Sequence, residues 1–165
     1  MLFGLPPFTL IHTLLSLIGI ATGFVVMFLG FLKGRDLPGW TVWFLATTSL
    51  TSVTGFLLPA NHFMPSHAVG LLSLVILAAA VYALYKQNLA GPWRRVFVIT
   101  SVAAQYLNVF VLVAQLFAKV PSLKALAPTQ TETPFQLAQG LVLIAFVVLG
   151  TLCVKRMNQG LKGRA

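Results

Sequence analysis

The sequence predicts an all-α integral membrane protein, a single domain over residues 1–165 built as a bundle of five transmembrane helices. Five long apolar segments divide the chain, and charged residues make up only 8% of it against 58% hydrophobic residues. A soluble domain carries about 25% charged residues. So little charge could not cover a folded surface in water, whereas a surface that faces lipid needs almost none.

The lengths of the apolar segments suit helices that cross a bilayer. A membrane-spanning helix needs about 20 apolar residues, within a range of about 17–25. The predicted spans are residues 8–32, 41–58, 67–85, 96–118 and 135–154. The second span is rich in Ser and Thr, whose hydroxyls we expect to bond helix carbonyls or neighbouring helices. In the first span, Gly19 and Gly23 have the GxxxG spacing that lets two helices approach closely, and we favour packing within the monomer over dimerisation.

The basic residues are distributed unevenly between the two sides of the predicted membrane. Only Lys119 and Lys124 lie on one side. The other side holds Lys33, Arg35, Lys86, Arg94, Arg95, Lys155, Arg156, Lys162 and Arg164. Because cytoplasmic loops carry the excess of Lys and Arg, the N-terminus is expected outside and the C-terminus in the cytoplasm.

The same distribution explains the net charge of +9 without nucleic acid. The basic residues flank membrane segments, so the expected partner is the lipid bilayer, and a further membrane protein is compatible with the exposed helix faces. Nucleic-acid binding is not predicted.

The sequence contains little that could carry catalysis. The only acids are Asp36 and Glu132, both in predicted connections, and no charged residue lies in the middle of a span. Ion-coupled transporters usually hold ionisable residues at membrane depth. The chain also has no P-loop, GxSxG or HExxH motif. We therefore assign no catalytic residue and favour a protein that is not an enzyme.

Polar residues recur at one level near the predicted outer face. His12 lies about one turn into the first span and His67 opens the third, which runs in the same direction. The amides at this level are Asn108, Gln115, Gln136 and Gln139. Since lipid cannot satisfy polar groups, these six residues are expected to converge inside the bundle.

Two interpretations of this layer remain open besides metal binding. In the first, which we favour, each polar side chain bonds a neighbouring helix, and the protein has a structural or accessory role. In the second, the layer binds haem b, with His12 and His67 as axial ligands and Lys119 or Lys124 near the propionates, in an electron-transfer protein. A quinone headgroup could occupy the same layer without a metal.

A metal site is the third interpretation. His62, Met64 and His67 offer imidazole and thioether ligands of the kind that copper accepts. The motif is short, so it is the weakest of the three.

Three segments resemble a family of small bacterial inner-membrane proteins to which no activity is attached. They are residues 65–70 (PSHAVG), 106–115 (YLNVFVLVAQ) and 126–130 (LAPTQ). The resemblance implies a bacterial inner-membrane location and indicates no chemistry.

Overall fold

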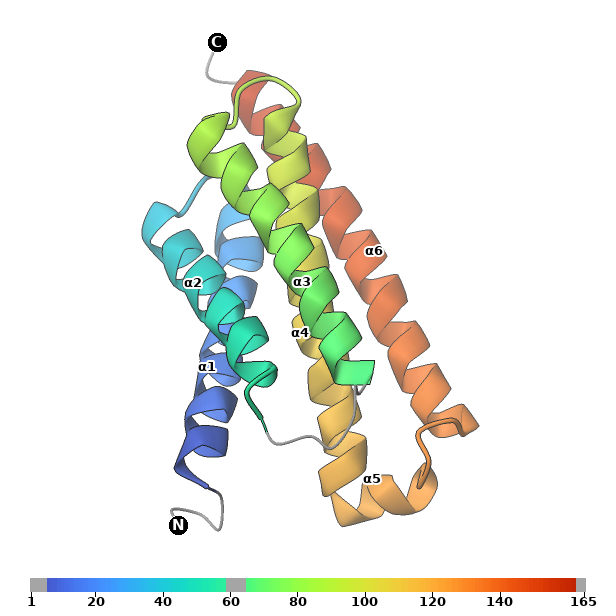
Figure 1. The fold of residues 1–165 in the computed structure, drawn as a ribbon. Helices are drawn as coiled ribbons and strands as arrows, with labels where there is room; N and C mark the ends of the chain where they lie inside the picture. Colours follow the sequence, from blue (N-terminus) through green and yellow to red (C-terminus); the bar gives the residue numbers. More distant parts are fainter. Residues whose placement is uncertain (1–5, 59–64, 163–165) are drawn as a thin grey trace.

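The computed structural model describes residues 6–58 and 65–162, which form helices with short connections and no strand (Figure 1). In chain order the elements are α1 (Pro7–Val25), the π-helical turn η1 (Val26–Gly30), the 3₁₀ turn η2 (Phe31–Lys33), α2 (Pro38–Gly55), α3 (Pro65–Val81), the π-helical turn η3 (Tyr82–Lys86), α4 (Trp93–Lys119), α5 (Pro121–Leu126) and α6 (Thr133–Lys162). Proline opens α1, α2, α3 and α5, where its missing N–H costs no hydrogen bond. The all-α prediction is confirmed.

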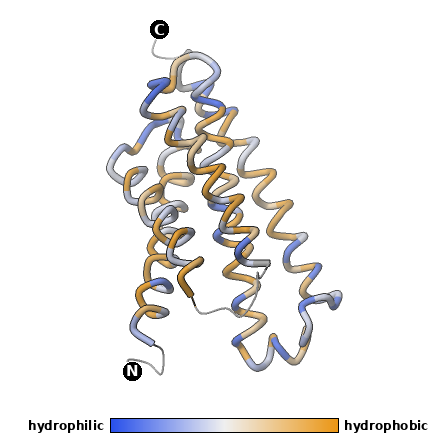
Figure 2. The backbone as a smooth tube through the Cα atoms, viewed as in Figure 1, coloured by the Kyte–Doolittle hydropathy of each residue, from blue (hydrophilic) through white to orange (hydrophobic). Residues whose placement is uncertain are grey.

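The five long helices run alternately up and down, so α1 begins and α6 ends at opposite ends of the bundle (Figure 1). Helix α4 lies centrally and packs against α1, α3 and α6. Helix α2 packs against α1 and α3, and η2 reaches α6. Hydrophobic residues line most of each long helix, while hydrophilic residues gather at the turns and in the α5 region (Figure 2).

Four of these helical stretches are long and apolar enough to cross a membrane: Pro7–Lys33, Ser66–Lys86, Trp93–Lys119 and Thr133–Gln159. The protein is therefore of the multi-pass membrane type. Helix α2, which holds most of the predicted second span, is not among the four. Its hydroxyl side chains lower its mean hydropathy, although several of them, including Thr47, Thr48 and Ser52, are buried in the bundle.

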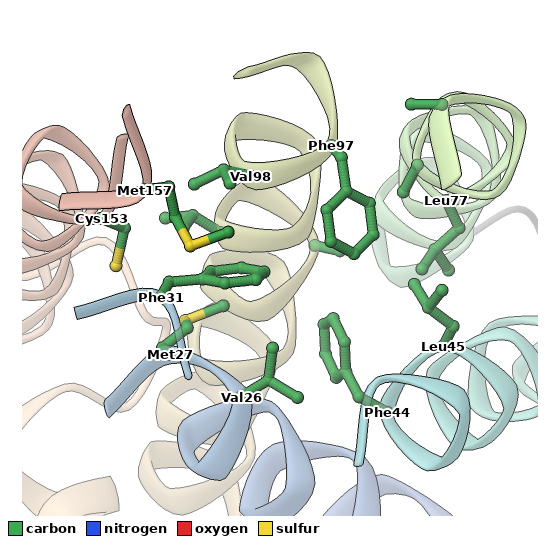
Figure 3. Close-up of a cluster of buried hydrophobic side chains, with 14 of the residues drawn as sticks. Val26, Met27, Phe31, Phe44, Leu45, Leu77, Phe97, Val98, Cys153 and Met157 are labelled. Atoms are coloured by element: carbon green, nitrogen blue, oxygen red, sulfur yellow. The ribbon is translucent and has the colours of Figure 1, made fainter. Parts of the chain in front are cut away.

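The hydrophobic core lies towards the end of the bundle at which α4 begins. Figure 3 shows its side chains in close-up. The turns η1 and η2, which follow α1, and the helices α2, α3, α4 and α6 contribute to it through Val26, Met27, Phe31, Phe44, Leu45, Leu77, Phe97, Val98, Cys153 and Met157. Phe31 and Phe97 meet edge to face, with 5.7 Å between ring centroids. We call this the core end. The only thiol of the chain, that of Cys153, is completely buried there.

The GxxxG pair lies where helices approach closely, as the sequence predicts. A Cβ atom on Gly19 would lie 3.1 Å from Thr48 Oγ1 of α2. A Cβ atom on Gly23 would overlap the side-chain amide of Gln105 on α4 and lie 2.9 Å from a ring carbon of Phe44. The two glycines therefore let α1 pack against α2 and α4 at once.

Candidate functional site

A cavity of about 350 Å³ lies between α1, α2, α3 and α4 at the end of the bundle opposite the core end. Four of the six residues of the predicted polar layer line it: His12, His67, Asn108 and Gln115. Small-molecule sites are typically cavities of about 300–1,000 Å³ with apolar walls and a few convergent polar groups. The cavity has this character, because aliphatic side chains such as Leu17, Ile20 and Leu112 complete its walls.

One face of α1 supplies the first wall. Thr9, His12, Thr13 and Ser16 line the cavity at helical spacing. The Thr13 hydroxyl donates to the carbonyl of Thr9 at 2.8 Å, and the Ser16 hydroxyl donates to that of His12 at 2.8 Å. These hydroxyls are thus satisfied within their own helix, and the imidazole of His12 is the group of this face that reaches another helix.

His12 is held by Thr54 of α2. Its Nδ1 atom lies 2.9 Å from Thr54 Oγ1. The Thr54 hydroxyl donates its hydrogen to the carbonyl of Leu50, at 2.7 Å. Since a hydroxyl has a single hydrogen and this one points to Leu50, Thr54 Oγ1 can only accept from His12, and on this basis we assign the imidazole proton to Nδ1.

His67 enters the cavity from the start of α3. Its ring stacks on that of Phe56, which follows α2, with 5.5 Å between centroids and 16° between planes. In the same lining, Ser52 of α2 forms a hydrogen bond with Ser73 of α3, with 3.2 Å between their hydroxyl oxygens.

The amides of α4 lie across the cavity from these residues. Asn108 donates from Nδ2 to Thr48 Oγ1 at 3.1 Å, which ties α4 to α2. The Gln115 amide lines the cavity and makes no side-chain hydrogen bond within the described part of the chain. Within the same ranges, the buried Thr51 hydroxyl oxygen in the lining also has no partner. Lys119 lies at the end of α4 and completes the lining.

Gln136 and Gln139 do not join the other four residues, so the expected convergence of all six does not occur. Gln139 Nε2 donates to the carbonyl of Phe110 at 3.0 Å, and Gln136 Nε2 donates to that of Thr131 at 2.7 Å. The reason is the position of α6, which packs on α4 and η2 and does not line the cavity. Backbone carbonyls close at hand satisfy these amides instead.

Thr54 and Phe56, which contact the two histidines, were not among the residues predicted for the site. The available signal was the run of hydroxyl residues towards the end of the second span, which lies at the depth of His12. As for a metal, His62 and Met64 fall outside the described residues. Within residues 6–58 and 65–162, no three His, Cys, Asp or Glu side chains gather as metal ligands.

A second hollow of about 490 Å³ runs between α4 and α6. Its lining is almost entirely apolar, with Tyr106 and Thr151 among residues such as Val102, Phe146 and Val154. It belongs to the lipid-facing surface of two membrane-type helices and lacks convergent polar groups. It is therefore a weaker candidate for a specific site.

The connection between α5 and α6 is organised by Glu132. Its carboxylate accepts hydrogen bonds from the hydroxyl and backbone N–H of Thr129, at 2.8 and 3.1 Å, and from the backbone N–H of Thr131 at 3.1 Å. Gln130 of the same turn donates to the carbonyl of Ala114 on α4, at 2.8 Å. Partial desolvation raises the pKa of Glu132, but together the bonds from Thr129 and Thr131 outweigh it and leave the pKa below its ordinary value of 4.5.

This carboxylate makes the stability of the connection depend on pH. Because the folded-state pKa is lowered, the stabilisation is complete above about pH 4.5 and is lost as pH falls through the folded-state value. We expect the thermal midpoint of the purified protein, followed by circular dichroism, to fall across that acidic range. Glu132→Gln should flatten that part of the profile, and an unchanged profile would assign the acid sensitivity to other groups.

No protein-family model matches the chain, and comparisons with curated proteins and with solved structures also find no match. Function is therefore inferred from the cavity and its lining.

Proposed function

We propose that this is a multi-pass protein of the bacterial inner membrane that binds a small lipid-soluble molecule with a polar headgroup, such as a quinone. Five helices cross the membrane, with the N-terminus outside and the C-terminus in the cytoplasm, so the cavity lies near the outer face. The observation that carries the proposal is the cavity itself. Histidines and amides from three helices line it together with aliphatic side chains.

Helix α2 is the fifth crossing helix in this proposal. Its 18 residues span about 27 Å at 1.5 Å per residue, close to the ~30 Å hydrocarbon core. The hydroxyls that lower its hydropathy are mostly buried or bonded to its own carbonyls, as for Thr47 and Ser52. The side chains that it leaves exposed are largely apolar: Trp40, Val42, Trp43, Leu50 and Val53.

The basic residues also favour five crossings. With five, the cytoplasmic side holds two in the α1–α2 connection, three between α3 and α4, and four at the C-terminus, which makes nine against two. If α2 did not cross, the α1–α2 and α4–α6 connections would share one side and the split would be seven against four. The positive-inside rule supports the more uneven arrangement.

Cysteine labelling of intact cells tests this topology. In a Cys153→Ser background, a membrane-impermeant maleimide should label Ser122→Cys in α5, whereas Gly39→Cys and Ala90→Cys should react only after the cells are permeabilised. A Cβ on Gly39 meets no atom within 4 Å, so that substitution should be tolerated. Labelling of Ala90→Cys or Gly39→Cys in intact cells would contradict the five-span arrangement.

The lining suits an amphiphile whose head is polar and whose tail is apolar. His12, Asn108 and Gln115 offer hydrogen bonds at one level, while Leu17, Ile20 and other aliphatic residues face the remainder of the ligand. A quinone has polar oxygens at opposite edges of a flat ring and an isoprenoid tail that favours lipid. Its head can therefore reach polar residues on facing helices at once.

Ligand-induced stabilisation tests the binding. A ligand at 100 times its Kd stabilises the folded state by about 2.7 kcal/mol. We expect a short-chain ubiquinone or its quinol to raise the thermal midpoint of the detergent-solubilised protein. Unfolding can be followed with a thiol-reactive dye, because the Cys153 thiol is buried in the folded state.

The matched variants for this test lie on one helix. Ser16→Phe should fill the cavity and abolish the stabilisation, whereas Ala21→Phe, on the exposed face of α1, should retain it. If neither redox form stabilises the protein, the quinone proposal fails and a structural or accessory role becomes the better interpretation.

Haem is the second candidate, because His12 and His67 reach the same cavity from two helices. A histidine that ligates a metal usually donates its other ring N–H to a neighbouring group, as His12 does to Thr54. In this candidate His12 and His67 would hold the iron, and Lys119 would pair with a propionate. The visible absorption spectrum of protein purified from haem-supplied cells tests it. An intense porphyrin band that His12→Ala removes would support haem, and a colourless protein would contradict it.

A further inference from the structure

The imidazole of His12 can distinguish a ligand that donates a hydrogen bond from one that only accepts. The protein itself fixes which ring nitrogen donates and which accepts. Thr54 donates its hydroxyl hydrogen to the carbonyl of Leu50, at 2.7 Å, so only a lone pair of Thr54 Oγ1 faces His12 Nδ1. Nδ1 must then carry the ring proton. In the neutral ring, Nε2 is left as a hydrogen-bond acceptor.

Within the described residues, no carboxylate lines the cavity to pair with a second proton on this ring. The only acids of the chain, Asp36 and Glu132, are absent from the cavity lining, and Asp36 pairs with Arg94 at 2.9 Å. The charged side chain that does line the cavity, Lys119, is basic. His12 Nε2 therefore presents a lone pair to a ligand.

The amides do not discriminate in the same way. Asn108 uses one N–H for Thr48 and retains a second N–H and its carbonyl oxygen. Gln115 likewise offers both donor and acceptor atoms. A ligand that donates or accepts can satisfy either amide, whereas only a donor can satisfy His12.

We propose that the cavity selects the reduced, hydroxyl-bearing form of a quinone over the oxidised form. This inference rests on the proposed function and adds the redox state of the ligand. A quinol hydroxyl can donate a hydrogen bond to His12 Nε2. A quinone carbonyl oxygen has no hydrogen to donate, so its lone pair and that of Nε2 would repel each other. The quinone would leave Nε2 of the half-buried imidazole without a partner, so the quinol should bind roughly tenfold more tightly.

This preference has an electrochemical consequence. Tighter binding of the reduced form raises the midpoint potential of the bound couple relative to the free one. For a two-electron couple, a tenfold preference corresponds to about 30 mV. The protein would accordingly hold quinol in the membrane in preference to quinone.

The test compares the affinities of one quinone in its two redox states. Ubiquinone and ubiquinol with a single isoprene unit are titrated anaerobically into the purified protein, and the ratio of their Kd values is measured. We expect the quinol to bind about tenfold more tightly. In Thr54→Val the Nδ1–H loses its acceptor, so the ring can present Nε2–H instead and the ratio should fall towards one.

Matched variants separate this effect from a general loss of structure. Thr100→Val removes a hydroxyl that bonds the carbonyl of Val96 at 2.7 Å, outside the cavity lining, and should preserve the ratio. His12→Gln replaces the acceptor by an amide that both donates and accepts, so it should also bring the ratio towards one if Thr54→Val fails to fold. Burial of the Cys153 thiol reports the folding of each variant.

The possible outcomes separate the preference for quinol from the more general proposal that the cavity binds a quinone. Equal affinities, or tighter binding of the quinone, in the unmodified protein would overturn the redox selectivity and leave the quinone site standing. An unchanged ratio in both folded Thr54→Val and folded His12→Gln would overturn the role of His12. Failure of both redox forms to bind would overturn the inference together with the quinone site.

Discussion

Replacing Gly23 by alanine is expected to destabilise the bundle by about 2–3 kcal/mol, the upper range for inserting a carbon atom into a packed interior. The new Cβ would overlap the Gln105 amide and lie 2.9 Å from a ring carbon of Phe44. Gln105 is fully buried and donates to the carbonyl of Ile20 at 2.8 Å, so it cannot move aside without losing that bond. The thermal midpoint, measured through exposure of the Cys153 thiol, should fall clearly.

Gly140 provides the control. It lies within α6, and a Cβ there would meet no atom within 4 Å. Alanine is better than glycine in a helix by up to about 1 kcal/mol, so Gly140→Ala should be neutral or slightly stabilising. Equal midpoints for the two variants would mean that α1 and α4 do not pack as described.

Replacing Phe31 by alanine should cost about 3 kcal/mol, at the lower end of the range for such core truncations. Phe31 opens η2 and is 1% exposed at the core end, where its ring meets Phe97 of α4 edge to face (Figure 3). Lipid is as apolar as this core, so the transfer part of the cost is small and the cavity left behind supplies most of it.

Phe28, one turn earlier, is the matched control for this variant. It is 48% exposed on the lipid-type surface, where acyl chains or detergent can refill the space that a truncated ring leaves. Phe28→Ala should therefore shift the thermal midpoint little. If Phe28→Ala destabilised the protein as much as Phe31→Ala, the assignment of the core end would be wrong.

Much of the candidate site could be anticipated from depth along the helices. His12 and His67 were expected at one level because each lies near the start of an apolar segment and the two segments run in the same direction. Asn108 follows in the second half of α4 and Gln115 near its end, and all four line the cavity. The depth of a residue in the membrane follows from its position along its own helix. It can therefore be read from each segment without knowing how the helices pack.

Gln136 and Gln139 show where that reasoning ends. They share the depth of the other residues but belong to α6, which packs on α4 outside the cavity. Packing between helices that are distant in the sequence decides two things. It sets the order of the helices around the bundle and which face of each helix points inward. Neither depth nor hydropathy contains this information, and a nearby backbone carbonyl satisfies a glutamine as well as a distant side chain would.

By itself, the sequence determined that the chain is all-helical and of the multi-pass membrane type, because low charge and long apolar segments leave no other way to cover its surface. It also predicted the close approach at Gly19 and Gly23. Only the tertiary structure decided that Gln105 fills the space left by Gly23 and that Thr54 meets His12. The physical reason is that hydropathy acts on each segment separately, whereas contacts between helices are chosen by the fit of whole faces against one another.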